Sequence, residues 1–156
     1  FGDAIGKKMF RHVANREASV VWDNAGHGKR ETVDYLSAPH AVFSYPEIAS
    51  VGLTEGEARK KHRLHDLLVG KAVYSEVARG EAMMEDDCFV KTIVLKETGK
   101  ILGCHIIGPY ASILIQEVVN TMAVGGDIWD LARGMHIHPA LPEVIIAAFG
   151  NLEELE

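Results

Sequence analysis

A histidine and a glutamate five positions apart near the C-terminus are the residues of this chain best suited to chemistry. They are His138 and Glu143, with Pro139 directly after the histidine and Pro142 directly before the glutamate. An imidazole titrates near neutrality, so it can take or give a proton at working pH. A nearby carboxylate can hold the ring in one tautomer and stabilise its charged form. Pro139 fixes the backbone beside the ring, and Pro142 suits the first turn of a helix that carries Glu143. The spacing therefore predicts a hydrogen-bonded proton-transfer dyad.

Two other interpretations of this stretch remain open. In the first, a helix happens to begin after two histidines, and neither histidine has a chemical role. In the second, His136 and His138 form one edge of a metal site, as His-x-His pairs can. A metal site needs three or four ligands, and the sequence offers no evident third ligand. We therefore expect no metal.

The segments that must position the dyad alternate between strand-like and helix-like patterns. Glu97-Thr98-Gly99-Lys100 separates two apolar runs and is a strong hairpin signal. Thr54 followed by Glu57 is the capping-box pattern that begins a helix. The expected strands cover residues 41–45, 50–53, 67–74, 89–96 and 101–108, and the expected helices cover 7–14, 54–62, 110–124, 128–132 and 142–149, with a loop over 24–30. Strands joined by a hairpin and surrounded by helices predict an α+β fold with a mainly antiparallel sheet.

Two of the expected helices are apolar on more than one side. Helix 110–124 carries seven large Ile, Leu, Val and Met side chains, and residues 144–149 of the last helix read Val-Ile-Ile-Ala-Ala-Phe without a polar break. A helix that is apolar all round must be covered on more than one side. Because we expect one small sheet to cover one side only, the pattern favours a subunit interface and a two-fold homodimer. The alternative is a helix sandwiched inside the domain.

Composition argues against several classes of partner. Sixteen basic residues against 22 acidic ones leave a formal net charge of −6, and no Lys/Arg run suggests a local nucleic-acid surface, so we expect no nucleic-acid partner. No apolar run is long enough to span a bilayer, so we expect no membrane. No signal-like segment opens the chain, and we expect a cytoplasmic protein. Cys88 follows acidic residues and Cys104 lies in an apolar run, which predicts unreactive thiols.

Several segments resemble one known family in the same order along the chain. They are the stretch around His138 together with residues 45–55, 99–109 and 111–117. These segments resemble the C-terminal interface domain of the pyridine nucleotide-disulfide oxidoreductases, a family of flavoenzymes. Within the family, the dihydrolipoamide dehydrogenases are the most similar group. Pro142 departs from that group, which usually has serine there.

The resemblance also implies how the chain is divided. Gly2-Asp3 resembles the family motif whose aspartate hydrogen-bonds the ribityl chain of FAD. Residues 1–34 would then be the C-terminal remnant of a FAD-binding domain with a linker, and residues 35–156 the dimerisation domain. The sequence has no Gly-x-Gly-x-x-Gly run and no Cys-(x)4-Cys redox pair. We therefore expect a piece of a longer enzyme that is inactive alone and binds no cofactor.

For the site, the resemblance implies an active centre shared between two subunits. His138 would deprotonate a dithiol, since the thiolate is the species that attacks a disulfide, and Glu143 would orient His138. The dyad would act on the partner subunit's flavin and redox cysteines, with Asp3, His138 and Pro139 at the cofactor. The parent enzyme would use FAD, NAD(P) and a dithiol or disulfide substrate. The resemblance also implies a cis peptide bond before Pro139. The rival hypothesis is a non-catalytic homodimerisation module in which the His–Glu pair is structural.

Overall fold

The computed structural model describes residues 1–155, which form two compact units with a boundary between Ala38 and Pro39. The first unit holds the 3-10 turn η1 (Gly2–Ile5) and the helix α1 (Arg11–His27). The division of the chain into a flavin-domain remnant and a dimerisation domain stays a prediction.

Helix α1 is longer than the sequence predicts, and it begins and ends later. The expected helix over residues 7–14 and the expected loop over 24–30 are both wrong at their boundaries, because α1 continues to His27. Asn24, a frequent turn former, does not end the helix. Its side chain instead exchanges hydrogen bonds of 2.9 and 2.8 Å with the backbone of Glu31 and so braces the segment that follows. Gly28, with a φ of 66°, ends the helix in the left-handed conformation that suits glycine.

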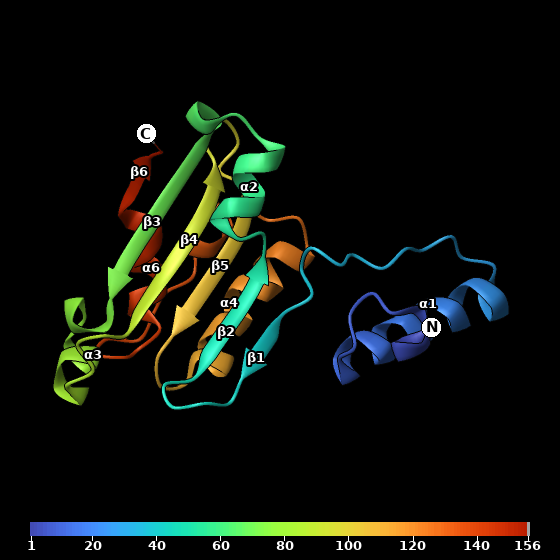
Figure 1. Cartoon of the computed structure of the whole chain (residues 1–156), viewed down its shortest axis with the longest axis horizontal. Coiled ribbons are helices and arrows are strands. Elements are labelled where there is room, and N and C mark those ends of the chain that lie inside the picture. Colours follow the sequence, from blue (N-terminus) through green and yellow to red (C-terminus); the bar gives the residue numbers. More distant parts are fainter. Residues whose placement is uncertain (156) are drawn as a thin grey trace. The chain divides into compact units, whose positions relative to one another are not determined.

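The second unit is built on one six-stranded sheet in the order β1-β2-β5-β4-β3-β6 (Figure 1). Every neighbouring pair of strands is antiparallel, which confirms the predicted α+β class. The strands are β1 (His40–Val42), β2 (Ile48–Gly52), β3 (Leu67–Val73), β4 (Phe89–Leu95), β5 (Ile101–Ile107) and β6 (Leu152–Glu154). The helices are α2 (Glu55–Lys61), α3 (Ala78–Met83), α4 (Ala111–Ala123), α5 (Ile128–Ala132) and α6 (Glu143–Gly150), with 3-10 turns η2 (Leu64–Asp66) and η3 (Tyr74–Glu76). Sequence patterns alone predict neither α3 nor β6.

Local signals explain several of these boundaries. Thr54 and Glu57 form the predicted capping box at the start of α2, with the Thr54 Oγ1 accepting from the Glu57 N–H at 3.3 Å. Asp127 caps α5 by accepting from the N–H groups of Trp129 and Asp130 at 2.8 and 3.0 Å. The predicted hairpin joins β4 to β5 and turns at Gly99, whose φ is 68°. The Asp127 cap therefore fixes the start of α5, which lies on the stretch of chain that leads from α4 to the dyad.

Helices α4 and α6 pack on the same face of the sheet, behind it in Figure 1, while α2 lies on the nearer face. Val144, Ile145 and Ala148 of α6 are fully buried in the chain's own core. A Cβ at Gly70 on β3 would come within 2.0 Å of the Ala148 carbonyl oxygen, so the helix lies directly against the strand. The inference that α6 needs a second subunit to cover it is thus wrong, because a six-stranded sheet is wide enough for two helices side by side. No helix within residues 1–155 is both long and apolar enough to cross a membrane.

Candidate active site

His138 and Glu143 lie in contact, as their spacing predicts. The Nδ1 of His138 is 2.8 Å from the Oε1 of Glu143. The second carboxylate oxygen of Glu143 accepts the backbone N–H of Ala140 at 2.9 Å. The peptide bond between His138 and Pro139 is cis, as the family resemblance implies. One carboxylate therefore spans the turn and holds both the ring and the backbone after it.

The start of α6 holds Glu143 in place. Pro142 occupies the N-cap position and Glu143 follows in the first turn, where the helix dipole favours a negative charge. The N–H of Ala140 and then the imidazole of His138 lower the pKa of Glu143 below its ordinary value. The carboxylate is therefore ionised at neutral pH and accepts from Nδ1–H. That hydrogen bond selects the tautomer with the Nε2 lone pair free.

The His138 ring presents that lone pair to the surroundings. Its side chain is 72% exposed, whereas the Glu143 side chain is 24% exposed. Within the part of the chain that the structure describes, Glu143 is the one polar partner of the ring. An oriented imidazole with one free nitrogen can accept a proton from an acid placed against it and later return the proton.

The residues predicted to touch a cofactor are exposed. Pro139 and His138 are adjacent in the second unit, while Asp3 belongs to η1 in the first. The backbone carbonyl of Asp3 accepts the N–H of Gly6 at 3.0 Å, which closes the turn. A cofactor role for these three residues stays a prediction.

A second histidine–glutamate pair lies beside the first, and the sequence patterns do not predict it. The Nε2 of His136 is 2.9 Å from the Oε2 of Glu117, which comes from the middle of α4. The other ring nitrogen, Nδ1, is 3.1 Å from the carbonyl oxygen of Gly134. Burial raises the pKa of Glu117, and the hydrogen bond with His136 offsets part of that rise. The His136 side chain, at 17% exposed, is far less accessible than that of His138.

A cavity of about 400 Å³ opens over this second pair. Glu117, Thr121, Met135, His136 and Ile137 are among the residues that line it. No group of three or more His, Cys, Asp or Glu side chains within residues 1–155 could hold a metal ion. His136 is instead directed to Glu117, and His138 to Glu143.

The two cysteines are unsuited to redox chemistry, as the sequence predicts. Both Cys88 and Cys104 are free and buried. Burial, followed by the hydrogen bond to Glu85, raises the pKa of Cys88 to about 11. Burial also raises the pKa of Cys104. Neither thiol therefore supplies a thiolate at neutral pH.

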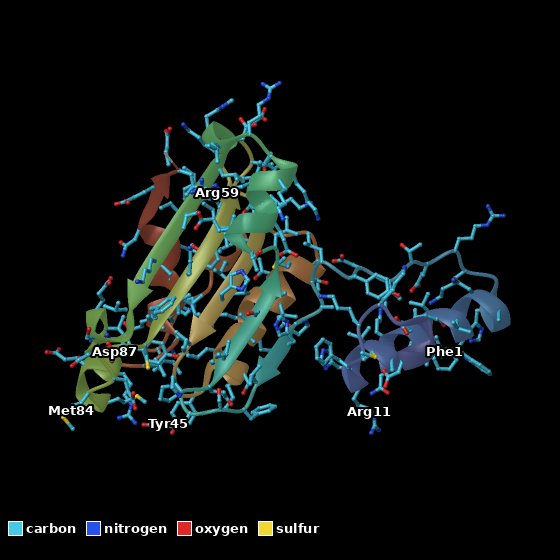
Figure 2. All side chains as sticks on the ribbon, in the orientation of Figure 1. Phe1, Arg11, Tyr45, Arg59, Met84 and Asp87 are labelled. Carbon is cyan, nitrogen blue, oxygen red and sulfur yellow. The ribbon has the colours of Figure 1, made fainter. Side chains whose placement is uncertain are left out.

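A separate exposed surface lies at one end of the sheet. Figure 2 shows Tyr45, Met84 and Asp87 gathered there, with Arg59 at the opposite end. Tyr45 and Met84 are 87% and 84% exposed, and the Tyr45 hydroxyl donates to Glu85 at 3.2 Å. These residues carry no proton-transfer pair comparable with that of His138.

The family model for the pyridine nucleotide-disulphide oxidoreductase dimerisation domain matches residues 38–149. Dihydrolipoyl dehydrogenase from Synechocystis sp. is 37% identical over 150 residues, covering 95% of this chain and 31% of that protein. Mycothione reductase from Mycobacterium tuberculosis is 41% identical over 150 residues, covering 92% of this chain and 32% of that protein.

Solved structures agree with the fold. LpdA from Mycobacterium tuberculosis superposes with a TM-score of 0.86 at 22% identity, covering 96% of this chain and 32% of that one, a likeness of fold alone. The HOCl-induced flavoprotein disulfide reductase RclA from Escherichia coli gives a TM-score of 0.83 at 27% identity, with coverage of 96% and 34%. The chain thus spans about a third of the length of the proteins that it matches.

Proposed function

The chain belongs to the pyridine nucleotide-disulphide oxidoreductase family, and we propose that it serves as the interface domain of an NAD(P)H-linked flavoprotein disulfide reductase. In that role His138 and Glu143 would be the proton-transfer dyad for dithiol/disulfide exchange and would act in trans, on the partner subunit. The observation that carries this proposal is the oriented ring of His138, tied at Nδ1 and exposed at Nε2. The names of the relatives, which are dehydrogenases and reductases of this kind, support it.

The proposed chemistry at His138 is the movement of one proton. A thiol S–H placed against Nε2 gives up its proton to the ring, and the thiolate that remains attacks a disulfide sulfur. Glu143 stabilises the resulting imidazolium through Nδ1–H. In the reverse direction the imidazolium returns the proton to the thiolate that leaves. The residues of this chain thus handle the proton, while bound FAD would supply the electron transfer.

The chain alone does not fit a dinucleotide. A pyrophosphate needs the clustered N–H groups of a glycine-rich turn at a helix start, and the sequence contains no Gly-x-Gly-x-x-Gly run. Asp3, His138 and Pro139 could at most touch one edge of FAD. We therefore propose that FAD and NAD(P) bind elsewhere in the full-length protein, and that residues 1–156 alone have no turnover.

A homodimer is supported by the apolar rim, which we define as Ile113, Val124, Met135 and Ile137. These side chains are 69%, 84%, 101% and 79% exposed. Met135 and Ile137 line the cavity over Glu117, and Ile113 stands one helical turn before Glu117 on α4. Leaving this surface in water is unfavourable by roughly 25 cal/mol per Å² of apolar area. A second copy would cover it and would bring His138 to the partner. A cytoplasmic location also stays a prediction.

Replacing the base tests this function in the full-length protein. His138→Gln should leave flavin reduction by NAD(P)H unchanged and slow the disulfide step roughly 10²- to 10⁴-fold, the usual contribution of a general base. Stopped-flow absorbance of the flavin separates the two half-reactions. Full activity of this variant would instead support the rival hypothesis of a structural dimerisation module.

The identity of the disulfide substrate can also be tested. Lipoamide and the disulfide mycothione are the two acceptors to compare, because a dihydrolipoyl dehydrogenase and a mycothione reductase are similarly close relatives. We propose lipoamide, since the segments that carry the family resemblance are similar to those of the dihydrolipoamide dehydrogenases and one such dehydrogenase is among the relatives. A higher kcat/KM for mycothione than for lipoamide would contradict this choice.

A further inference from the structure

The ring of His136 has both of its nitrogens engaged, in contrast to that of His138. Nδ1 faces the carbonyl oxygen of Gly134 at 3.1 Å, and Nε2 faces the carboxylate of Glu117 at 2.9 Å. A carbonyl oxygen can only accept, so Nδ1 must carry a hydrogen. The neutral ring would then point its Nε2 lone pair at a carboxylate oxygen. Two acceptors cannot make that contact without a proton between them.

The pair therefore holds one proton on the line between Nε2 and Oε2. Charge-assisted hydrogen bonds of this kind are stronger than neutral ones, more so where water is partly excluded. The His136 and Glu117 side chains are only 17% and 29% exposed. The second oxygen of Glu117, Oε1, is buried and has no hydrogen-bond partner among the described residues. The negative charge of Glu117 thus depends on His136 for compensation.

Other titratable groups around the pair do not replace this partner. Cys104 on β5 is close enough for Glu117 to raise its thiol pKa, but burial keeps that thiol neutral. Asp130 on α5 lines the same cavity and pairs with Arg133 at 3.6 Å. Glu143 on α6 is tied to His138 and Ala140.

We propose that Glu117 and His136 are positioning residues for the proposed disulfide reaction: their shared-proton pair fixes the Gly134–His138 segment to α4 and thereby sets the direction of His138. This inference rests on the proposed function. His136 precedes His138 by two residues, and Glu143 holds the segment from its other side. The His138 ring is thus positioned from two sides, by Glu117 on α4 through His136 and by Glu143 on α6. A shift of about 1 Å in a reacting group can lower a rate by as much as 10²-fold, so such anchoring matters.

Nuclear magnetic resonance of the 156-residue chain tests the shared proton without any assay of activity. At pH 7, ¹⁵N spectra should show hydrogens on both ring nitrogens of His136. In Glu117→Gln the side-chain amide can donate to Nε2 of His136. Only Nδ1 of that ring should then carry a hydrogen, while the signals of His138 stay unchanged. In Glu117→Ala the His138 signals should shift or broaden. Gln116→Ala, on the exposed side of the same helix, is the matched control and should alter neither ring.

The full-length protein tests the consequence for the reaction. Glu117→Ala should slow the disulfide step roughly tenfold or more and leave flavin reduction unchanged, whereas Glu117→Gln should stay within about twofold of the native rate. The positioning role is overturned if Glu117→Ala changes neither the His138 signals nor the disulfide step, or if Glu117→Gln fails as badly as Glu117→Ala. A ring of His136 that lacks a proton at Nε2 in the native chain overturns the shared proton. These outcomes leave the proposed function standing, because that function is tested separately by the activity of His138→Gln.

Discussion

Two histidines separated by a single residue have acquired opposite surroundings in this molecule. His138 keeps one nitrogen free, its side chain is 72% exposed, and its carboxylate partner is ionised and well supported by an N–H group. His136 has both nitrogens engaged, its side chain is 17% exposed, and its carboxylate partner is partly buried. The same two residue types therefore serve two purposes. One pair presents a ring that can exchange a proton, and the other uses its proton to hold the backbone.

The largest effect should come from removing the helix that supports the first pair. Ile145 is fully buried against the sheet, so Ile145→Asp would bury an unpaired charge. We expect the chain to lose its folded structure, which circular dichroism and urea unfolding would report. The milder Ile145→Ala should cost about 2–5 kcal/mol of unfolding free energy.

Ile113→Asp is the matched control on the other helix. Ile113 is 69% exposed, so this variant should fold normally and should weaken the proposed dimer instead. Sedimentation at micromolar concentration would show the difference. A native-like, stable Ile145→Asp chain would mean that α6 is held in some other way.

The next largest effect is a difference between Glu143 and Glu117 in the full-length protein. Glu143 accepts from both His138 and the N–H of Ala140, and a glutamine has only one oxygen to offer them. Glu143→Gln should therefore slow the disulfide step roughly 10- to 100-fold, less than loss of the base itself. Glu117→Gln keeps its single hydrogen bond and should change this rate little. Equal losses in the two variants would remove the distinction between the pairs.

The smallest effect is a difference in the pH dependence of stability. The N–H of Ala140 and then His138 lower the pKa of Glu143 below 4.5. Its contribution to stability is therefore complete above the unfolded value and is lost as the pH falls through the folded value. Burial raises the pKa of Glu117 above 4.5, so its contribution is complete below that value and is lost as the pH rises.

Urea unfolding of the chain between about pH 3.5 and 6.5 would measure this difference. As the pH rises, the native chain should gain stability relative to Glu143→Gln and lose stability relative to Glu117→Gln. Each glutamine resembles a protonated carboxyl group and serves as the reference for its own site. A change of the same sign for both variants would contradict the opposite surroundings of the two carboxylates.

The sequence predicts the first pair and most of the sheet because their signals are local. His138 and Glu143 stand on two sides of one turn, and the capping box at Thr54 and the hairpin at Gly99 each lie within a few residues. The fold class follows from those elements. The hydrogen-bonded pair can therefore be predicted from the sequence alone.

The second pair was not predictable in the same way. Glu117 precedes His136 by 19 residues and reaches it only because α4 and the Gly134–His138 segment pack together. Its one signal in the sequence is that Glu117 is the one charged residue of α4. The burial of α6 was likewise missed, because the number of strands beneath it depends on long-range pairing that includes the short edge strand β6.

The central claim, that His138 acts on the partner subunit, is tested most directly by mixing two inactive full-length proteins. One carries His138→Gln, and the other lacks a cysteine of the proposed redox pair. If the dyad acts in trans, random exchange of subunits should restore about a quarter of native disulfide reduction, because half of the dimers are mixed and each mixed dimer has one intact site. Mixtures that exchange subunits yet remain inactive would show that His138 does not complete the partner's site.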